Sequence, residues 1–153
     1  MTVEQLVKHY LQDAKMMHLA TVADGKPWVC NVWFAADEDF NIYWFSSVTR
    51  RHSQEVAKDS HVAGSMCLAN DPAKNGDWGM QFEGVAEMLT DEADIAKAKS
   101  VYMGRIFTEE RVKELMGHAE RPHKFYRIKP ELFVIFDGVN FPDNPRQEWR
   151  PNA

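Results

Sequence analysis

The sequence contains little cysteine and no long apolar run. Of its 153 residues only Cys30 and Cys67 are cysteine, and they form no closely spaced pair of the kind that binds zinc or builds a disulfide framework. No apolar segment approaches the ~20 residues that span a membrane. Residues 1–10 also lack the basic and apolar regions of a signal peptide. We therefore expect a protein of the reducing cytoplasm without membrane contact.

Positive charge and metal-binding patterns are scarce as well. The formal net charge of −5 argues against nonspecific nucleic-acid binding, for which a basic stripe is typical. The six histidines show no ligand spacing with a carboxylate or thiolate, so a metal site is not expected. The sequence shows no Ser-His-Asp or Cys-His arrangement, and neither cysteine lies in an electropositive helix start. Nucleophilic catalysis by a side chain is therefore not expected, and no catalytic residue is assigned.

Aromatic residues, in contrast, are plentiful. Five tryptophans in a chain of 153 residues favour flat surfaces on which a ring can stack, or a dimer interface. The length predicts one domain over residues 1–153, with an irregular C-terminal tail at 138–153.

Strands and hairpins dominate the predicted fold. Two runs rich in β-branched and aromatic residues, 28–34 and 41–45, flank an acidic turn, and Asp24-Gly25 marks an earlier hairpin. Close approach of another segment is expected at Gly64, and a bend or bulge at Gly84. Further strands are expected at 17–22, 61–69, 78–89, 123–128 and 132–136, with a loop at 70–77.

The predicted helices are short and lie between the strands. Thr2 and Gln5 form a capping-box pattern before the first helix. Residues 53–59 predict about two helical turns, and Thr90 and Thr108 begin two further helices, which we expect to form a lid or cap. Because no strand-helix-strand alternation is sustained, a small antiparallel β-barrel with peripheral helices is the best architecture.

One segment, Ser46 to His52, combines several phosphate-compatible groups. It places hydroxyls, two guanidiniums and an imidazole at the start of a predicted helix, whose first amides have no carbonyl partner. Arginine can hold a phosphate with two parallel hydrogen bonds. A flat ring lying along Cys30 to Trp33 could send a phosphate tail to the end of the next strand, ~5 Å away. The alternatives are a polar loop that only caps the helix and an ordinary core strand.

With these motifs in this order, the chain resembles the pyridoxamine 5′-phosphate oxidase-like family of FMN-binding split barrels. The motifs that carry the resemblance are residues 24–27, 30–34, 41–46 and 47–52. The resemblance implies a mainly β fold, a six-stranded antiparallel split barrel of the Greek-key type with peripheral α-helices. It also implies a homodimer with one FMN in each of two clefts between the subunits.

Position by position, the resemblance assigns the FMN phosphate to Arg51, supported by Ser46 and Thr49, with Arg50 as an additional contact. His52 stands where the family usually has a second basic residue, and a neutral imidazole supplies no charge there. The flavin ring would lie along Cys30 to Trp33, and a strand of the other subunit would approach it. The cofactor-binding residues expected are Cys30, Asn31, Val32, Trp33, Phe45, Ser46, Thr49, Arg50, Arg51, His52, Trp78, Met80 and Gln81.

The function implied is that of an FMN-dependent oxidoreductase acting on an unidentified small substrate. The C-terminal motif with which the true oxidase binds its vitamin substrate is not found, and residues 144–150 are at most a distant counterpart, so vitamin B6 oxidation is not expected. Two alternatives stay open: a non-catalytic protein that binds flavin or haem in the same dimer cleft, and a structural dimer whose cleft is vestigial.

Overall fold

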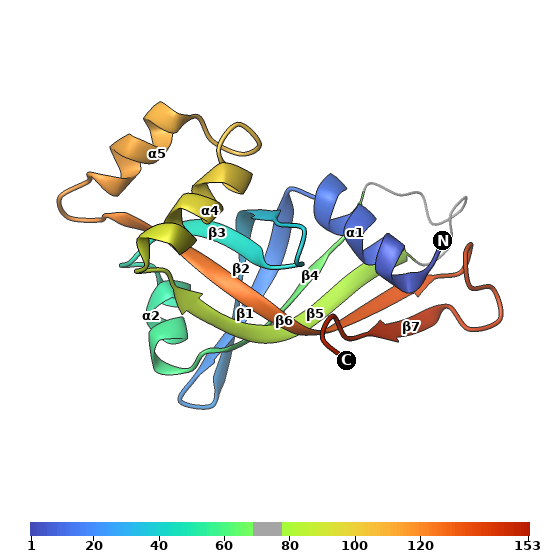
Figure 1. The fold of residues 1–153 in the computed structure, drawn as a ribbon. Helices are drawn as coiled ribbons and strands as arrows, with labels where there is room; N and C mark the ends of the chain where they lie inside the picture. Colours follow the sequence, from blue (N-terminus) through green and yellow to red (C-terminus); the bar gives the residue numbers. More distant parts are fainter. Residues whose placement is uncertain (69–77) are drawn as a thin grey trace.

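The computed structural model describes residues 1–68 and 78–153, so the loop expected at 70–77 lies outside the described residues. Figure 1 shows the elements in chain order: α1 (Val3–Asp13), β1 (Met16–Ala23), β2 (Lys26–Ala36), β3 (Ile42–Ser47), α2 (Arg51–Lys58), β4 (His61–Met66), β5 (Trp78–Met88), α4 (Glu92–Tyr102), α5 (Glu109–Met116), β6 (His123–Asp137) and β7 (Arg146–Trp149). None of the described helices has the length and apolar character needed to cross a membrane.

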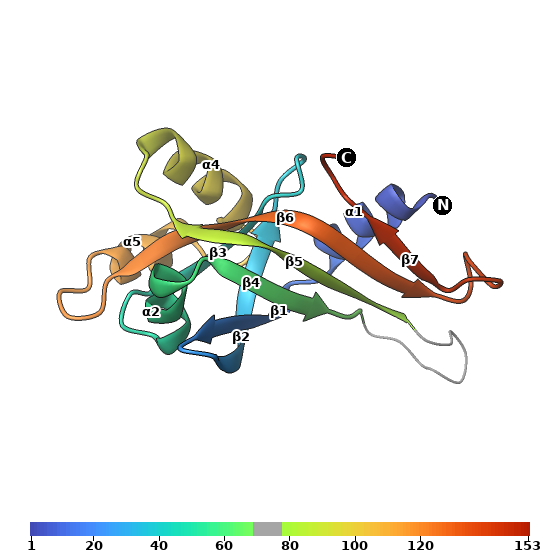
Figure 2. The same ribbon diagram turned by 90° about the horizontal axis from the view of Figure 1, so that it is seen from below.

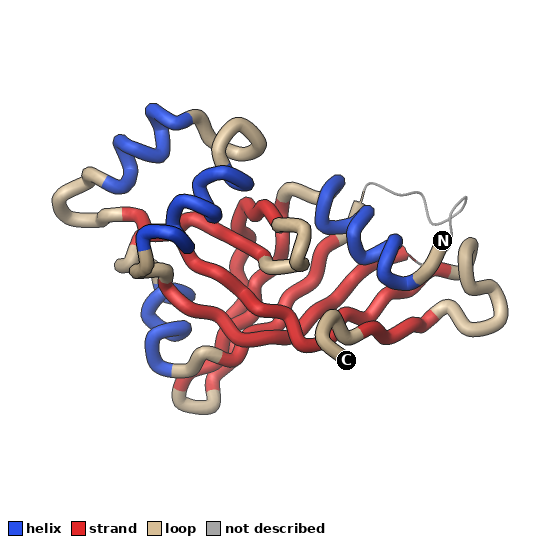
Figure 3. The backbone as a smooth tube through the Cα atoms, viewed as in Figure 1, coloured by secondary structure: helices blue, strands red, loops and turns tan. Residues whose placement is uncertain are grey.

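Six strands close into a ring, which confirms the expected split barrel. The sheet order is β3-β2-β1-β4-β5-β6-β7, and an additional pairing of β3 with β6 closes the ring from β1 to β6. Because β1, β2 and β3 follow one another and β4 returns beside β1, the arrangement is a Greek key. Figure 3 shows the strands as one curved layer with the helices around it.

The strand count differs from the expected six, because part of the tail is ordered as a strand. β7 pairs antiparallel with residues 133–136 of β6, outside the ring. Trp149 of β7 stacks on Phe133 with ring centroids 6.0 Å apart and lies 4.6 Å from the ring of Phe40. The expectation of an irregular tail over 138–153 is therefore wrong at residues 146–149, where aromatic packing onto the barrel holds the chain.

β6 is one continuous strand, and the expected break around Lys129-Pro130 is wrong. The register between β5 and β6 shifts between Glu83 and Gly84, so that Gly84 lies opposite Pro130. A β-bulge tolerates a proline within a strand, since the local ladder is already interrupted there. A Cβ at Gly84 would meet the carbonyl oxygen of Lys129 at 2.4 Å, which explains the glycine and confirms the expected bulge.

Local sequence signals explain the first two turns. Asp24 and Gly25 both have positive φ, 53° and 73°, as a two-residue hairpin turn between β1 and β2 requires. Between β2 and β3, the carboxylate of Asp37 accepts hydrogen bonds from the backbone N–H groups of Asp39 and Asn41, at 3.0 and 2.9 Å. Both expected hairpins are confirmed.

The helices cover different parts of the barrel (Figures 1 and 2). α1 closes the barrel core with Leu6, Val7 and Tyr10, and its capping box between Thr2 and Gln5 is confirmed. α4 and α5 pack in a second apolar cluster with Tyr43 and Phe45 of β3. Because one face of β3 meets the barrel core and the other meets these helices, all six of its residues are buried.

Helix boundaries shift by one or two residues from the expectation. α2 begins at Arg51 rather than at Ser53, so the two arginines lie at its start. The N-cap of α4 is Asp91, whose side chain accepts a hydrogen bond from the backbone N–H of Asp94, and not Thr90. Thr108 caps α5 as expected, through a bond from Arg111 N–H.

Gly64 in β4 confirms the expected close approach. A Cβ at this position would lie 2.3 Å from the ring of Phe82 and 2.8 Å from the carbonyl oxygen of His18. Neighbouring strands therefore leave no space for a side chain there.

Candidate functional site

Each part of β2 pairs with another strand on one side only. β1 pairs with β2 from Lys26 to Trp33, whereas β3 pairs with it only from Phe34 to Ala36. Beyond Trp44, β3 pairs with β6 alone. Among the described residues, the β3-facing edge of residues 26–33 therefore has no strand partner. Backbone N–H and C=O groups at such an edge can hydrogen-bond a ligand.

The side chains of this part of β2 alternate between two faces. Cys30 is half-buried and Val32 is buried, both against the barrel core, while Asn31 and Trp33 are exposed on the outer face. Burial and, to a lesser extent, the charge of Glu55 raise the pKa of Cys30 to about 11. Its thiol is therefore protonated at neutral pH. Cys30 and Val32 can offer a ligand at this edge only their backbone groups.

The edge leads to the start of α2, where the backbone amides are not capped. Arg50 is the N-cap residue and its side chain makes no capping hydrogen bond. The first intrahelical bond of the segment runs from Gln54 N–H to the Arg50 carbonyl, at 3.0 Å. Ser47 and Thr49 hydroxyls hydrogen-bond each other at 2.9 Å, which holds the preceding turn in shape. An uncapped helix start of this kind favours an anion.

The two arginines at the start of α2 differ in what they contact. Arg51 donates from Nε to both carboxylate oxygens of Glu55, at 3.3 Å, and its guanidinium carbon lies 4.1 Å from the ring centroid of Trp28. Within the described residues, Arg50 has no hydrogen bond or ion pair from its side chain. Arg50 is thus the arginine whose donors are free, and Arg51 is the one held towards β2.

Ser46 and His52 face inward and contact each other. Nε2 of His52 lies 2.9 Å from Oγ of Ser46, and both residues are buried. Burial, followed by the positive charge of Arg50, lowers the pKa of His52 below its usual value, so the imidazole is neutral at pH 7. The structure therefore brings Thr49, Arg50 and Arg51 to the surface but turns Ser46 and His52 into the protein.

The remaining expected site residues are spread over different environments. Phe45 stacks on Phe125 of β6, with ring centroids 4.5 Å apart, beneath α4 and α5. Met80 is buried in the barrel core, whereas Gln81 is exposed on the outer face of β5. Trp78 begins β5, and its side chain lies outside the described part of the structure.

Comparison with known proteins identifies the family. The family model described as pyridoxamine 5′-phosphate oxidase matches residues 3–134. The chain belongs to the pyridoxamine 5′-phosphate oxidase family. Its match to that family covers every element from α1 to most of β6. A comparison with curated protein sequences gave no significant match.

Solved structures share the fold at low sequence identity. A heme-binding protein from Mycobacterium smegmatis is similar with a TM-score of 0.80 at 12% identity, over 99% of this chain and 59% of that one. HutZ, the heme storage protein from Vibrio cholerae, has a TM-score of 0.67 and 24% identity, over 86% and 92%. An FAD-binding protein from Mesorhizobium loti has a TM-score of 0.64 and 17% identity, over 86% and 90%.

The outer face of β1 and β2 carries a cluster of exposed apolar side chains. Met16 and Trp33 are paired across the two strands, and Val29 lies on the same face, 59% exposed. Beside them, Nδ1 of His18 lies 3.2 Å from Oγ of Ser65 on β4. Sequence reasoning did not single out His18, because its partner is 47 positions away.

Trp28 and Glu55 were also not identified from the sequence as neighbours of the site. Both contact Arg51, one through its ring and the other through its carboxylate. Trp28 belongs to a strand and Arg51 to a helix after the following strand, so no local spacing signal connects them.

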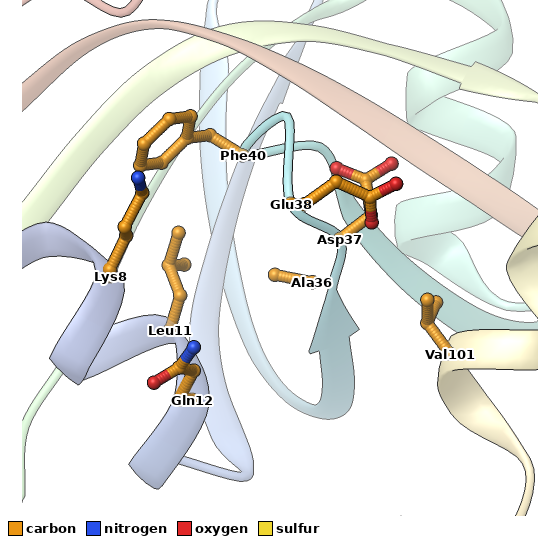
Figure 4. A pocket seen from close by; sticks show the side chains of 8 residues that line it. All are labelled: Lys8, Leu11, Gln12, Ala36, Asp37, Glu38, Phe40 and Val101. Carbon is orange, nitrogen blue, oxygen red and sulfur yellow. The ribbon is translucent and has the colours of Figure 1, made fainter.

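A separate cavity of about 360 Å³ lies between α1, the β2–β3 turn and α4 (Figure 4). Its lining residues are Lys8, Leu11, Gln12, Ala36, Asp37, Glu38, Phe40 and Val101. Its charged groups already have partners: Glu38 pairs with Lys97, and Asp37 accepts hydrogen bonds from Asn41 and Tyr43. The cavity is therefore not the preferred site.

In the described residues, no three His, Cys, Asp or Glu side chains could hold a metal ion.

Proposed function

We propose that the protein is a homodimeric flavoprotein that binds FMN noncovalently beside β2 and acts as an oxidoreductase on a small substrate. The observation that carries this proposal is the unpaired edge of β2 over residues 26–33, which ends beside the uncapped start of α2. A flavin needs both features: hydrogen-bonding groups along the polar edge of its ring and an anion site for its phosphate.

The residues present fit the two ends of the cofactor. The backbone of Cys30 to Trp33 would meet the ring, and the first amides of α2 with Thr49, Arg50 and Arg51 would hold the phosphate. The free donors of Arg50 support this assignment, because a guanidinium binds phosphate with two parallel hydrogen bonds. Ser46 and His52 support the turn from inside through their mutual hydrogen bond. Bound flavin would supply the hydride chemistry, and the chain would orient it and shield it from water.

The cluster of exposed apolar side chains on β1 and β2 supports a dimer. Met16, Val29 and Trp33 are large apolar residues at the surface of adjacent strands. Aromatic residues and methionine are enriched at protein interfaces. A second subunit on this face would also bring its Gln81 near the cleft.

Both cysteines are free, which supports a reducing, cytoplasmic location.

Flavin binding is tested by purifying the protein and titrating it with FMN. We expect yellow material, or quenching of tryptophan fluorescence on FMN addition, with one FMN per subunit. Reduction of the bound flavin by NADH or NADPH, followed by stopped flow, separates an enzyme from a carrier. A colourless protein whose fluorescence ignores added FMN would contradict the proposal.

Haem binding in the same dimer cleft is the second candidate, and His18 is the observation that favours it. Its ring is exposed and Nδ1 lies against Ser65, which leaves Nε2 free to bind iron. Two similar structures are those of heme proteins. A Soret band after haem addition that is lost in His18→Ala would decide for haem, whereas flavin bands would decide for FMN.

A further inference from the structure

Polar contacts tie together the walls of the cavity between α1, the β2–β3 turn and α4 (Figure 4). Lys97 of α4 pairs with Glu38 of the turn, with Nζ and Oε1 2.7 Å apart. Just after α4, Nη2 of Arg105 donates to the carbonyl oxygen of Ala14, the residue that ends α1, at 2.7 Å. α4 is thus tied to both of the other walls, and the cavity between them is preformed.

The third contact, between α1 and the turn, involves Phe40. The ammonium group of Lys8 on α1 lies 5.2 Å from the centroid of the Phe40 ring. Phe40 has a φ of 68°, in the left-handed region, which is rare for a bulky residue and is strained. The ring packs against Trp149 of β7, with centroids 4.6 Å apart, and this contact retains the strained backbone. Phe40 is therefore held in place at the cavity wall.

The charged groups that line the cavity already have partners. The carboxylate of Asp37 accepts four hydrogen bonds from groups of the β2–β3 turn and β3. Glu38 pairs with Lys97, and Lys8 pairs with Glu4 at 3.0 Å. A charged ligand would have to displace one of these partners, and burial of a charge without a partner is costly. The cavity therefore favours an uncharged occupant.

The other lining residues are apolar except for one carboxamide. Leu11, Ala36, Phe40 and Val101 supply an apolar and aromatic surface, and Gln12 adds its side-chain amide. Within the part of the chain that the structure describes, this amide has no hydrogen-bond partner. A carboxamide can both donate and accept a hydrogen bond. The volume of about 360 Å³ falls in the range of small-molecule sites, roughly 300–1,000 Å³.

We propose that this cavity is a second ligand site, which binds an uncharged aromatic compound of one or two rings that carries a single polar group. The rings pack against Phe40, Leu11 and Val101, and the polar group hydrogen-bonds the amide of Gln12. The site is separate from the proposed flavin site, so the inference does not rest on the proposed function.

The test compares three probes with the same two-ring body: 2-naphthol, which is neutral, 2-naphthoate, an anion, and 2-naphthylmethylamine, a cation at neutral pH. Calorimetry measures the affinity of each for the purified protein, with and without FMN. Ala36→Leu adds bulk at the cavity wall. Ala119→Leu adds the same bulk at an exposed position after α5 and serves as the matched control.

We expect 2-naphthol to bind at least about tenfold more tightly than either charged probe, a difference of about 1.4 kcal/mol. Ala36→Leu should weaken 2-naphthol at least about tenfold and leave the FMN titration unchanged, whereas Ala119→Leu should alter neither. The inference is overturned if 2-naphthol does not bind, if a charged probe binds equally well, if Ala36→Leu has no effect, or if FMN displaces 2-naphthol.

Gln12→Ala provides a second variant, because Gln12 is exposed on α1 and its replacement leaves the core intact. Loss of one hydrogen bond should weaken 2-naphthol by about three- to tenfold. If Ala36→Leu does not fold, Gln12→Ala decides: an unchanged affinity overturns the inference. A chain that binds 2-naphthol through Gln12 but binds no flavin would contradict the proposed function and leave this second site standing.

Discussion

The guanidinium of Arg51 lies over the ring of Trp28, with its central carbon 4.1 Å from the ring centroid. This cation–π contact, together with the ion pair to Glu55, directs Arg51 towards β2. Arg50, the preceding residue, is left with free donors at the uncapped start of the helix. Two adjacent arginines thus take different roles at the proposed phosphate site.

The first prediction separates these roles. Arg50→Gln should weaken FMN binding by about 1.5–3 kcal/mol, the free energy of a charge-assisted hydrogen bond. Arg51→Gln should cost less, because Arg51 divides its donors between Glu55 and the phosphate. Titration of each variant with FMN measures both, and Lys58→Gln at the exposed end of α2 serves as control. Equal losses in all three variants would show a general charge effect instead.

The second prediction concerns the dimer. Val29→Asp should shift the protein to monomers and lower FMN affinity, because a buried, unpaired carboxylate at the interface costs several kcal/mol. Val139→Asp is the matched control, since Val139 is also exposed, by 70%, but lies after the end of β6. Light scattering after size-exclusion chromatography reports the mass. A Val29→Asp protein that stays dimeric would place the interface elsewhere.

The third prediction tests the close approach of β4 to its neighbours. Gly64→Ala should lower the free energy of unfolding by about 1–3 kcal/mol, because the new Cβ would overlap the Phe82 ring and the His18 carbonyl. Gly79→Ala, where a Cβ meets nothing within 4 Å, should change it by less than about 0.5 kcal/mol. Urea denaturation measures both. Similar stabilities of the two variants would contradict the packing described.

The fourth prediction follows from His52, whose pKa is lowered in the folded protein by burial and by Arg50. The unfolded chain then binds the proton more readily, so the free energy of unfolding should fall as pH drops below about 6.5. His52→Gln, which keeps a neutral partner for Ser46, should reduce this loss.

The control for the pH effect is His9→Gln, because His9 is half-exposed on α1. The measurement is urea denaturation at a series of pH values between neutral and mildly acidic. A pH dependence that His52→Gln leaves unchanged would assign the effect to other groups, of which His123, with a similarly lowered pKa, is the first to test.

Much of the barrel could be predicted from local signals. The Asp24-Gly25 turn and the Thr2–Gln5 capping box each depend on residues close in sequence, and both are confirmed. The bulge expected at Gly84 is also confirmed, although it depends on the opposite strand. The break expected at Pro130 was wrong because that proline lies opposite Gly84 of another strand, and the bulge there is a property of the pair.

The sequence predicted which segment forms the candidate site, but not which of its side chains face outward. Residues 46–52 do form the turn and helix start that an anion site needs, and the short polar pattern alone indicated this. Which side chains face outward depends on α2 beginning at Arg51, two residues earlier than expected. That start turns His52 inward to Ser46 and leaves Arg50 as the cap residue.

The sequence by itself determined the hairpins, the helix caps and the position of a polar, arginine-bearing turn after an aromatic strand, because these depend on backbone preferences and side-chain spacing within a few residues. Only the tertiary structure decided that β3 pairs with β6 along its whole length but with β2 over only three residues, and that Trp28 and Glu55 hold Arg51 while Arg50 stays free. These contacts join segments from separate strands and helices, and burial of the barrel core sets their positions.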